Sequence, residues 1–360
     1  MHGRQAPLRR DERAARRAAA QRLAVGDDRP PRPRSRVGSP ASMAGPSVVA
    51  LGGGHGLAAS LSALRHVTDR LTGVVTVADD GGSSGRLRRE LGVLPPGDLR
   101  MALSALCDDG EWGRLWRDVL QHRFASAGAL HQHAMGNLLI VTLWELLGDT
   151  VEGLDWVGRL LGARGRVLPM AAVPLDIEAT VRGADPADPA GVVTVRGQVA
   201  VATTPGDVVA LRLVPEQPPA CPEALDAIME ADWVVLGPGS WFTSVLPHLL
   251  VPELSAALHE TRARRCVTMN LATQAGETEG FSSEAHLEVL AAHAPELRID
   301  AVLADPSSVE DPGTLSDVAG TLGARLLMRQ VSLGDGTPRH DPLRLAAAYR
   351  DVFDAVLGDV

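Results

Sequence analysis

A glycine-rich segment at residues 52–56 has the composition of a phosphate-binding turn. It follows an apolar run and precedes an Ala/Leu/Ser-rich stretch. This order predicts a strand, a turn and a helix start, where backbone N–H groups and the helix dipole attract phosphate. His55 either donates to that phosphate or lies in solvent. The spacing G-x-G-x-x-A, at Gly54, Gly56 and Ala59, also fits a dinucleotide-binding turn. The predicted phosphate-binding residues are Gly52, Gly53, Gly54, His55 and Gly56.

A second polar segment, predicted as a loop over residues 79–85, carries two adjacent carboxylates. Asp79 and Asp80 repel each other unless a cation or sugar hydroxyl groups neutralise or bind them. The alternative is a solvated acidic turn. Arg86 follows the loop and offers forked donors that suit a phosphate. We predict that Asp79, Asp80, Ser83, Ser84 and Arg86 contact a ligand.

Asp98 follows Pro95-Pro96-Gly97 at the start of a predicted helix. It either caps that helix or joins Asp79 and Asp80 as a third carboxylate for a Mg²⁺ ion. Arg100, two residues further on, is expected to neutralise remaining ligand charge.

A second strand–turn–helix pattern occurs at residues 237–240 and repeats the expected anion geometry, with hydroxyl groups added. Simple helix capping by Ser240 is the alternative. Asn137, at the start of an apolar helix, either caps that helix or reaches a base or ribose. His131 and His133 form an H-x-H pair that predicts core or surface histidines rather than a metal site. The residues predicted to contact the ligand from these two regions are Asn137, Gly237, Gly239, Ser240 and Thr243.

These residues require a scaffold of apolar strands that alternate with amphipathic helices. Such a pattern predicts a Rossmann-like, three-layer α/β fold with a parallel sheet. Residues 166–214 change to β-branched alternation and predict a β-rich insertion. Ligands of parallel sheets bind beyond the strand C-termini, so four post-strand loops are expected around one cleft. Strands are predicted at 47–52, 71–77, 232–236, 266–269 and 301–303, and the four loops are 52–56, 79–85, 237–240 and 270–277.

Amino-acid composition gives further predictions about the N-terminal segment, the chemistry and the location of the protein. Residues 1–46 hold eleven Arg against four acidic residues and predict either a basic, disordered Arg/Pro-rich arm or a misannotated start. Residues 47–360 are expected to form a single domain. The chain has no Lys, which excludes a Walker or Schiff-base lysine. Three widely spaced Cys and no apolar run of about 18 residues predict a cytoplasmic protein without a membrane span.

Taken together, the blocks resemble the gluconeogenesis-factor family of YvcK-type proteins, which is similar to CofD, the 2-phospho-L-lactate transferase. The resemblance extends from about residue 47 to the end of the chain. It implies a CofD-like fold, a UDP-sugar or similar nucleotide ligand, and roles in growth on gluconeogenic carbon sources and in cell shape. The transferase branch uses Mg²⁺, but the Asp-Asp loop here continues as Gly-Gly-Ser-Ser-Gly-Arg, which is the YvcK-type version. The matching blocks are 50–57, 76–89, 95–106, 136–139, 236–254 and 273–278.

Three functions are compatible with the sequence. The first is a non-catalytic nucleotide-sugar-binding regulator, favoured because no base–nucleophile pair stands out. The second is a CofD-like, Mg²⁺-dependent phosphotransferase, and the third is an NAD-dependent oxidoreductase. The expected partners are a small-molecule nucleotide, an unidentified protein and a second copy of the chain, with no specific nucleic-acid binding.

Overall fold

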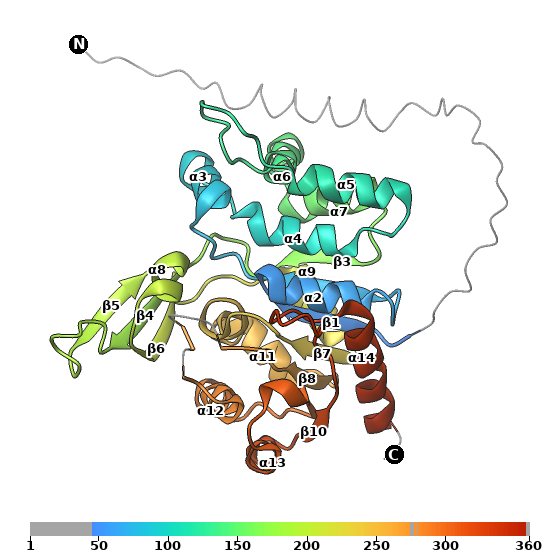
Figure 1. Cartoon of the computed structure of the whole chain (residues 1–360). Coiled ribbons are helices and arrows are strands. Elements are labelled where there is room, and N and C mark those ends of the chain that lie inside the picture. The colour runs from blue at the N-terminus through green and yellow to red at the C-terminus, as the bar shows by residue number, and fades with distance from the viewer. Residues whose placement is uncertain (1–44, 274–276, 279, 358–360) are drawn as a thin grey trace.

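A seven-stranded parallel sheet organises the computed structural model, which describes residues 45–273, 277–278 and 280–357 (Figure 1). The predicted N-terminal arm therefore lies outside the described residues, apart from its last two positions. The strand order is β10-β9-β8-β7-β1-β2-β3. The strands are β1 (Val48–Gly52), β2 (Leu71–Val75), β3 (Arg166–Pro169), β7 (Trp233–Leu236), β8 (Arg264–Thr268), β9 (Ala301–Ala304) and β10 (Arg325–Met328).

The strand order reverses at β1. The chain passes from β1 to β2 on one side, and returns as β7 on the other. Leu51 is in register with Leu236 of β7 and Val74 of β2. All five residues of β1 are buried, as expected for a central parallel strand covered on both faces. The predicted α/β fold class is confirmed.

Helices cover the sheet and extend beyond it. Those near β3 gather at one end of the molecule, α12 and α13 lie at the other end near β10, and α14 packs beside α2 (Figure 1). None of the described helices is long and apolar enough to cross a membrane. The helices are α2 (Gly54–Leu64), α3 (Gly82–Leu91), α4 (Pro96–Leu106), α5 (Glu111–Gln121), α6 (Met135–Leu147), α7 (Thr150–Leu161), α8 (Gln198–Thr203), α9 (Pro222–Met229), η1 (Trp241–Val245), α10 (Pro247–Leu250), α11 (Pro252–Glu260), α12 (Ser283–His293), η2 (Pro306–Ser308), α13 (Pro312–Thr321) and α14 (Pro342–Leu357).

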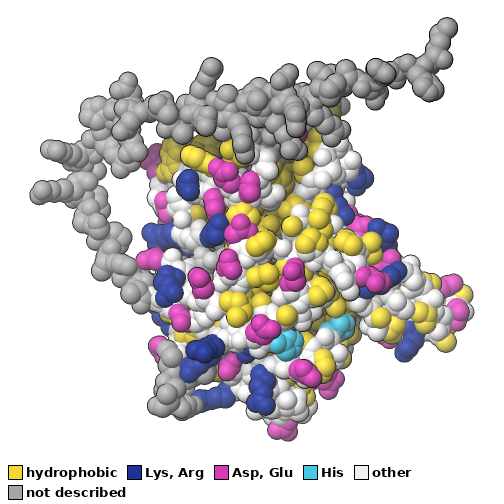
Figure 2. Space-filling view, turned by 180° about the vertical axis from the view of Figure 1, so that it is seen from behind, with side chains coloured by type: hydrophobic (Ala, Val, Ile, Leu, Met, Phe, Trp, Pro, Cys, Tyr) yellow, Lys and Arg dark blue, Asp and Glu magenta, His cyan; other side chains and the backbone are white. Residues whose placement is uncertain are grey.

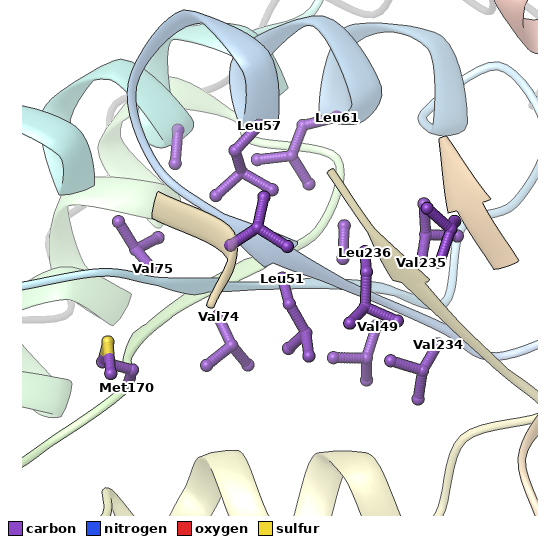
Figure 3. Close-up of a cluster of buried hydrophobic side chains, with 14 of the residues drawn as sticks. Val49, Leu51, Leu57, Leu61, Val74, Val75, Met170, Val234, Val235 and Leu236 are labelled. Carbon is purple, nitrogen blue, oxygen red and sulfur yellow. The ribbon is translucent and has the colours of Figure 1, made fainter. Parts of the chain in front are cut away.

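Apolar side chains on both faces of the sheet hold the first strand and helix in place. Leu57 and Leu61 of α2 pack on one face of the sheet. Val49 and Leu51 of β1 project from the opposite face (Figure 3). All four side chains are buried. Each contributes about 1.5–3 kcal/mol through removal of apolar surface from water. This packing fixes the N-terminus of α2 directly beyond the end of β1.

A smaller antiparallel sheet of order β5-β4-β6 projects from the body (Figures 1 and 2). Its strands are β4 (Asp176–Arg182), β5 (Val192–Arg196) and β6 (Asp207–Val214), and α8 lies between β5 and β6. The sequence pattern predicts a single β-rich insertion over residues 166–214. In the structure, β3 pairs with β2 as the edge strand of the large sheet, so the small sheet begins only at Asp176.

The segment 79–85 is not entirely a loop, and this prediction was wrong. Helix α3 begins at Gly82, despite the low helix propensity of Gly and Ser. Tertiary contacts override propensity here: Gly97 and Ala134 donate backbone hydrogen bonds to the hydroxyls of Ser84 and Ser83.

Tyr349, the single tyrosine of the chain, links α14 to α2 and β8 through its buried hydroxyl. Its Oη lies 2.8 Å from Ser60 Oγ and 3.0 Å from Thr268 Oγ1. Tyr349→Phe leaves these two buried hydroxyls short of a partner, so we expect a loss of about 1–3 kcal/mol in the free energy of unfolding. Urea denaturation measures this loss. Thr142→Val, at an exposed position on α6, is the control, and an equal loss in both variants would contradict the assignment.

Candidate functional site

The two predicted glycine turns meet at the point where the strand order reverses. A Cβ atom on Gly56 would lie 2.1 Å from the Pro238 carbonyl oxygen and 2.5 Å from Gly239 Cα. Gly237 and Gly239 have φ angles of +72° and +135°, which L side chains rarely adopt. The backbone of the first turn therefore packs directly on the backbone of the second, and only glycine permits this approach.

The N-terminus of α2 has no side-chain cap of its own. Its N-cap is Gly53, and Asp98 approaches it from α4, where it accepts a hydrogen bond from the Gly54 N–H. A Cβ on Gly53 would lie 2.7 Å from Asp98 Oδ2 and 3.1 Å from Ser244 Oγ. Thr76 ties the site together, since its hydroxyl donates to the carbonyl oxygens of Gly52 and Ser244. The first turn of α2 thus lies in a compact polar corner.

Asp98 does not cap its own helix, so that interpretation was wrong. The N-cap of α4 is Pro95, and Asp98 is in the first turn of the helix with its carboxylate directed to α2. Burial, together with the nearby charge of Asp79, raises the pKa of Asp98 from 3.8 to about 7. This carboxyl group can therefore gain or lose a proton near neutral pH.

Asp79 lies in the same pocket as Asp98. Its Oδ1 accepts a hydrogen bond from Gly81 N–H at 2.9 Å, and a Cβ on Gly97 would lie 2.7 Å from its Oδ2. Burial raises the pKa of Asp79, and the hydrogen bonds from Gly81 and Ser84 oppose that rise. A cavity of about 210 Å³ is lined by both carboxylates together with Ser83, Ser84, Arg100 and Asn137.

Asp80 is not brought into this cavity. Its Oδ1 accepts a hydrogen bond from Val199 N–H at 3.1 Å, at the start of α8 in the small-sheet region. Adjacent residues in an extended segment point in opposite directions. Asp79 therefore faces the cavity, whereas Asp80 contacts the start of α8. Within the described ranges, no three His, Cys, Asp or Glu side chains are grouped so as to hold a metal ion. A Mg²⁺ site would therefore depend on Asp79, Asp98 and the phosphates of a ligand.

Asn137 and Arg100 form a buried network beside the carboxylates. Arg100 Nε donates to Asn137 Oδ1 at 2.9 Å, and Asn137 Nδ2 donates to Ser83 Oγ at 3.0 Å. Ser83 Oγ lies 3.1 Å from His133 Nδ1, a pairing that sequence analysis missed. The separation of 50 residues between them left no local signal. His133 therefore contacts a serine that lines the cavity.

Arg86 does not reach the cavity. Its guanidinium donates to the backbone carbonyl oxygens of Ala129 and His131, at 3.3 Å and 2.7 Å. It is on α3, and the helical geometry directs it away from Ser83 and Ser84. Arg86 thus contacts the segment before α6, while Arg100 and Arg123 are the arginines that line the cavity.

The second turn presents its helix N-terminus to the chain's own carboxylate rather than to open space. Glu277 Oε1 accepts hydrogen bonds from the N–H groups of Phe242 and Thr243 at 2.9 Å and 3.1 Å, and from the Ser240 hydroxyl. Ser240 also caps η1 by accepting from Thr243 N–H. The predicted anion geometry is present, but the anion is Glu277. Ser240 and Thr243 therefore have internal partners, as the capping alternative anticipated. Residues 274–276 of the predicted loop 270–277 lie outside the described residues.

Removal of this internal anion should destabilise the fold. Glu277→Ala removes the side-chain acceptor of the buried Phe242 N–H and leaves Thr243 N–H with Ser240 Oγ alone, so we expect the free energy of unfolding to fall by about 1–3 kcal/mol. Urea denaturation provides the measurement, with Glu296→Ala at an exposed position as the control. Equal stability of the two variants would show that Glu277 does not bind the turn.

A further hollow of about 440 Å³ adjoins the glycine corner on its other side. Gly56 and Gly239 line it, and so does Asn270, whose Oδ1 accepts from Gly239 N–H while its Nδ2 donates to Gly239 O. Loops after β1, β2, β7 and β8 therefore converge at one edge of the sheet, as the sequence predicted. Sequence analysis missed Thr76 and Gly97 as site residues, although each adjoins a motif that it identified.

The fold and the site together define a Rossmann-like α/β protein whose polar loops gather at the switch point of a parallel sheet. A family model described as "2-phospho-L-lactate transferase CofD" matches residues 48–318. The chain belongs to the CofD family.

Named relatives refine this assignment. A protein of Mycobacterium tuberculosis (strain CDC 1551 / Oshkosh), named "Putative gluconeogenesis factor", is 56% identical over 309 residues, which cover 85% of this chain and 90% of the relative. The "Gluconeogenesis factor" of Bacillus subtilis (strain 168) is 36% identical over 266 residues, covering 74% and 80%. A crystal structure of a upf0052 family member from Bacillus halodurans matches with a TM-score of 0.75 and 31% identity, covering 88% of this chain and all of that one.

Proposed function

We propose that this protein is a regulator of carbon metabolism that binds a nucleotide sugar, a UDP-sugar, without chemical turnover. The packing of Gly56 against Pro238 at the switch point carries the proposal, because it brings a helix N-terminus whose N-cap residue has no side chain to the place where parallel sheets bind ligands. Relatives named gluconeogenesis factors support a role in carbon metabolism. A cytoplasmic location and an effect on cell shape and wall formation belong to the same proposal.

Each part of the ligand has a suitable neighbour in this proposal. The N–H groups that follow Gly54 in the first turn of α2 bind the diphosphate, because the helix dipole favours negative charge there. Asp79 accepts hydrogen bonds from sugar hydroxyls, and Arg100 neutralises remaining charge. Where Mg²⁺ accompanies the ligand, Asp79 and Asp98 would hold it together with the phosphates, since Mg²⁺ is commonly bound by one or two carboxylates plus phosphate oxygens.

Isothermal titration calorimetry with UDP-GlcNAc tests the proposal directly. We expect saturable heat at micromolar to millimolar ligand, weaker binding in EDTA and recovery on addition of Mg²⁺. NAD is titrated in parallel, because the G-x-G-x-x-A turn also fits a dinucleotide. The absence of heat with UDP-GlcNAc at millimolar concentration would falsify the assignment. Tighter binding of NAD than of UDP-GlcNAc would identify NAD as the ligand instead.

A phosphotransferase is the second candidate, favoured by the two partly buried carboxylates beside the start of α2. With its pKa of about 7, Asp98 can accept a proton from an attacking hydroxyl near neutral pH. The protein is incubated with Mg²⁺, a nucleotide-activated donor and a panel of alcohols, and products are identified by mass spectrometry. Transfer of a phosphoryl group that Asp98→Asn abolishes would establish turnover. The regulator proposal predicts no transferred product.

A further inference from the structure

An arginine-rich hollow of about 590 Å³ lies beside α2, bordered by α4 and α5. Four arginines line it, and no Asp or Glu does so among the described residues. Further polar side chains of its wall are Ser62, Ser104, Gln121 and His55. A concave surface with four positive charges and no carboxylate attracts anions. The lining arginines are Arg65, Arg100, Arg117 and Arg123.

The four arginines differ in how far their charge is already compensated. Arg65 forms an ion pair with Asp109 at 2.7 Å, and Arg117 lies 3.7 Å from the same carboxylate. The hydrogen bonds of Arg100 go to the side-chain amides of Asn137 and Gln121, and that of Arg123 goes to the carbonyl oxygen of Gln132. These acceptors are neutral. Asp98 and Asp79 partly compensate the charge of Arg100 from the adjoining cavity. The least compensated positive charge of the hollow therefore belongs to Arg123.

Arg100 and Arg123 also act on each other. Both guanidiniums line the hollow, and their positive charges repel each other. Arg100 is only 4% exposed, so little water screens its charge. An anion bound against both guanidiniums would remove the repulsion and accept forked hydrogen bonds, which guanidinium groups form well with phosphate.

We propose that this hollow binds a phosphate monoester at a position separate from the diphosphate of the nucleotide sugar. The two guanidiniums bind the phosphoryl group, and Ser62, Ser104 and Gln121 offer hydrogen bonds to hydroxyls of the attached carbon chain. The hollow has room for more than inorganic phosphate alone. Arg100, Met101 and Arg123 also line the cavity of Asp79 and Asp98, so the two anion positions are neighbours, and the titrations with UDP-GlcNAc described below separate them.

Calorimetry on the full chain tests this proposal with inorganic phosphate and glycerol 3-phosphate, in a buffer without other multivalent anions. We expect both to bind, and glycerol 3-phosphate to bind more tightly. Arg123→Gln should weaken both by about tenfold or more, as expected for loss of a charge-assisted contact. Arg117→Gln provides a second variant. The matched control is Arg114→Gln, an exposed arginine on α5 outside the hollow, with an expected change of less than about twofold.

The titrations are repeated with saturating UDP-GlcNAc to separate the two sites. Retained phosphate binding supports a distinct site, whereas competitive displacement would overturn it. Unchanged affinity in Arg123→Gln, equal weakening in Arg114→Gln, or no binding of either probe to the unaltered chain would also overturn it. Phosphate binding without any UDP-GlcNAc binding would leave this site standing and contradict only the nucleotide-sugar proposal.

Discussion

Gly56→Ala is expected to reduce UDP-GlcNAc affinity by about 100-fold, which corresponds to about 2.7 kcal/mol. The added Cβ would lie 2.1 Å from the Pro238 carbonyl oxygen, so the start of α2 or the second turn must move. The obstructing atoms, which belong to Pro238 and Gly239, are backbone atoms, so no side chain can rotate away. The same change should lower the free energy of unfolding by about 1–3 kcal/mol or more, as overpacking does in other cores.

Gly320→Ala in α13 is the matched control for this substitution. An added Cβ there would meet nothing within 4 Å, so affinity should stay unchanged and stability should stay equal or rise slightly. Calorimetry measures affinity and circular dichroism confirms that each variant is folded. A folded Gly56→Ala variant with the affinity of the unaltered chain would show that the contact between the turns does not shape the ligand site.

Asp98→Asn should stabilise the protein increasingly as pH rises. In the unfolded chain this carboxyl has its ordinary pKa of 3.8, and in the folded chain its pKa is about 7. The folded state therefore binds more protons between these values, and its stability falls as pH increases through this window. The difference corresponds to about 4 kcal/mol, which is fully lost above about pH 7. An asparagine does not titrate, so Asp98→Asn is free of this loss.

Urea denaturation at pH 4 and pH 8 measures this effect. Relative to the unaltered chain, Asp98→Asn should gain about 4 kcal/mol more at pH 8 than at pH 4. Asp118→Asn removes an exposed carboxylate of α5 and should show no comparable gain. Parallel pH profiles for Asp98→Asn and the unaltered chain would contradict a buried, partly protonated Asp98.

The parts of the fold that surround the site could be predicted, because central parallel strands are buried on both faces and appear as continuous apolar runs. β1 and β7 have this form, and each leads directly into a glycine turn. The edge strand β10 was not identified, because only one of its four residues is buried and they do not form a buried run. β3 was assigned to the insertion, since a short edge strand and an antiparallel strand have similar composition.

Long-range contacts explain most of what sequence analysis missed or misassigned at the site. Glu277 binds the N–H of Phe242 across a separation of 35 residues, and no local pattern connects the two. Asp98 looked like a cap because it follows two prolines and a glycine, but its carboxylate binds another helix. Asp79 and Asp80 were treated as a pair, although only Asp79 faces the cavity. The positions of the motifs could therefore be predicted from the sequence. The direction of each side chain could not, because it depends on contacts with residues far away in the chain.

A crystal structure of the protein with UDP-GlcNAc tests the central claim most directly. The account predicts diphosphate oxygens within hydrogen-bond distance of the first backbone N–H groups of α2, beside the packed turns at Gly56 and Pro238. It also predicts that the carboxylates of Asp79 and Asp98 lie next to the sugar or to a bound Mg²⁺. Diphosphate density bound away from the edge shared by β1 and β7 would contradict the account.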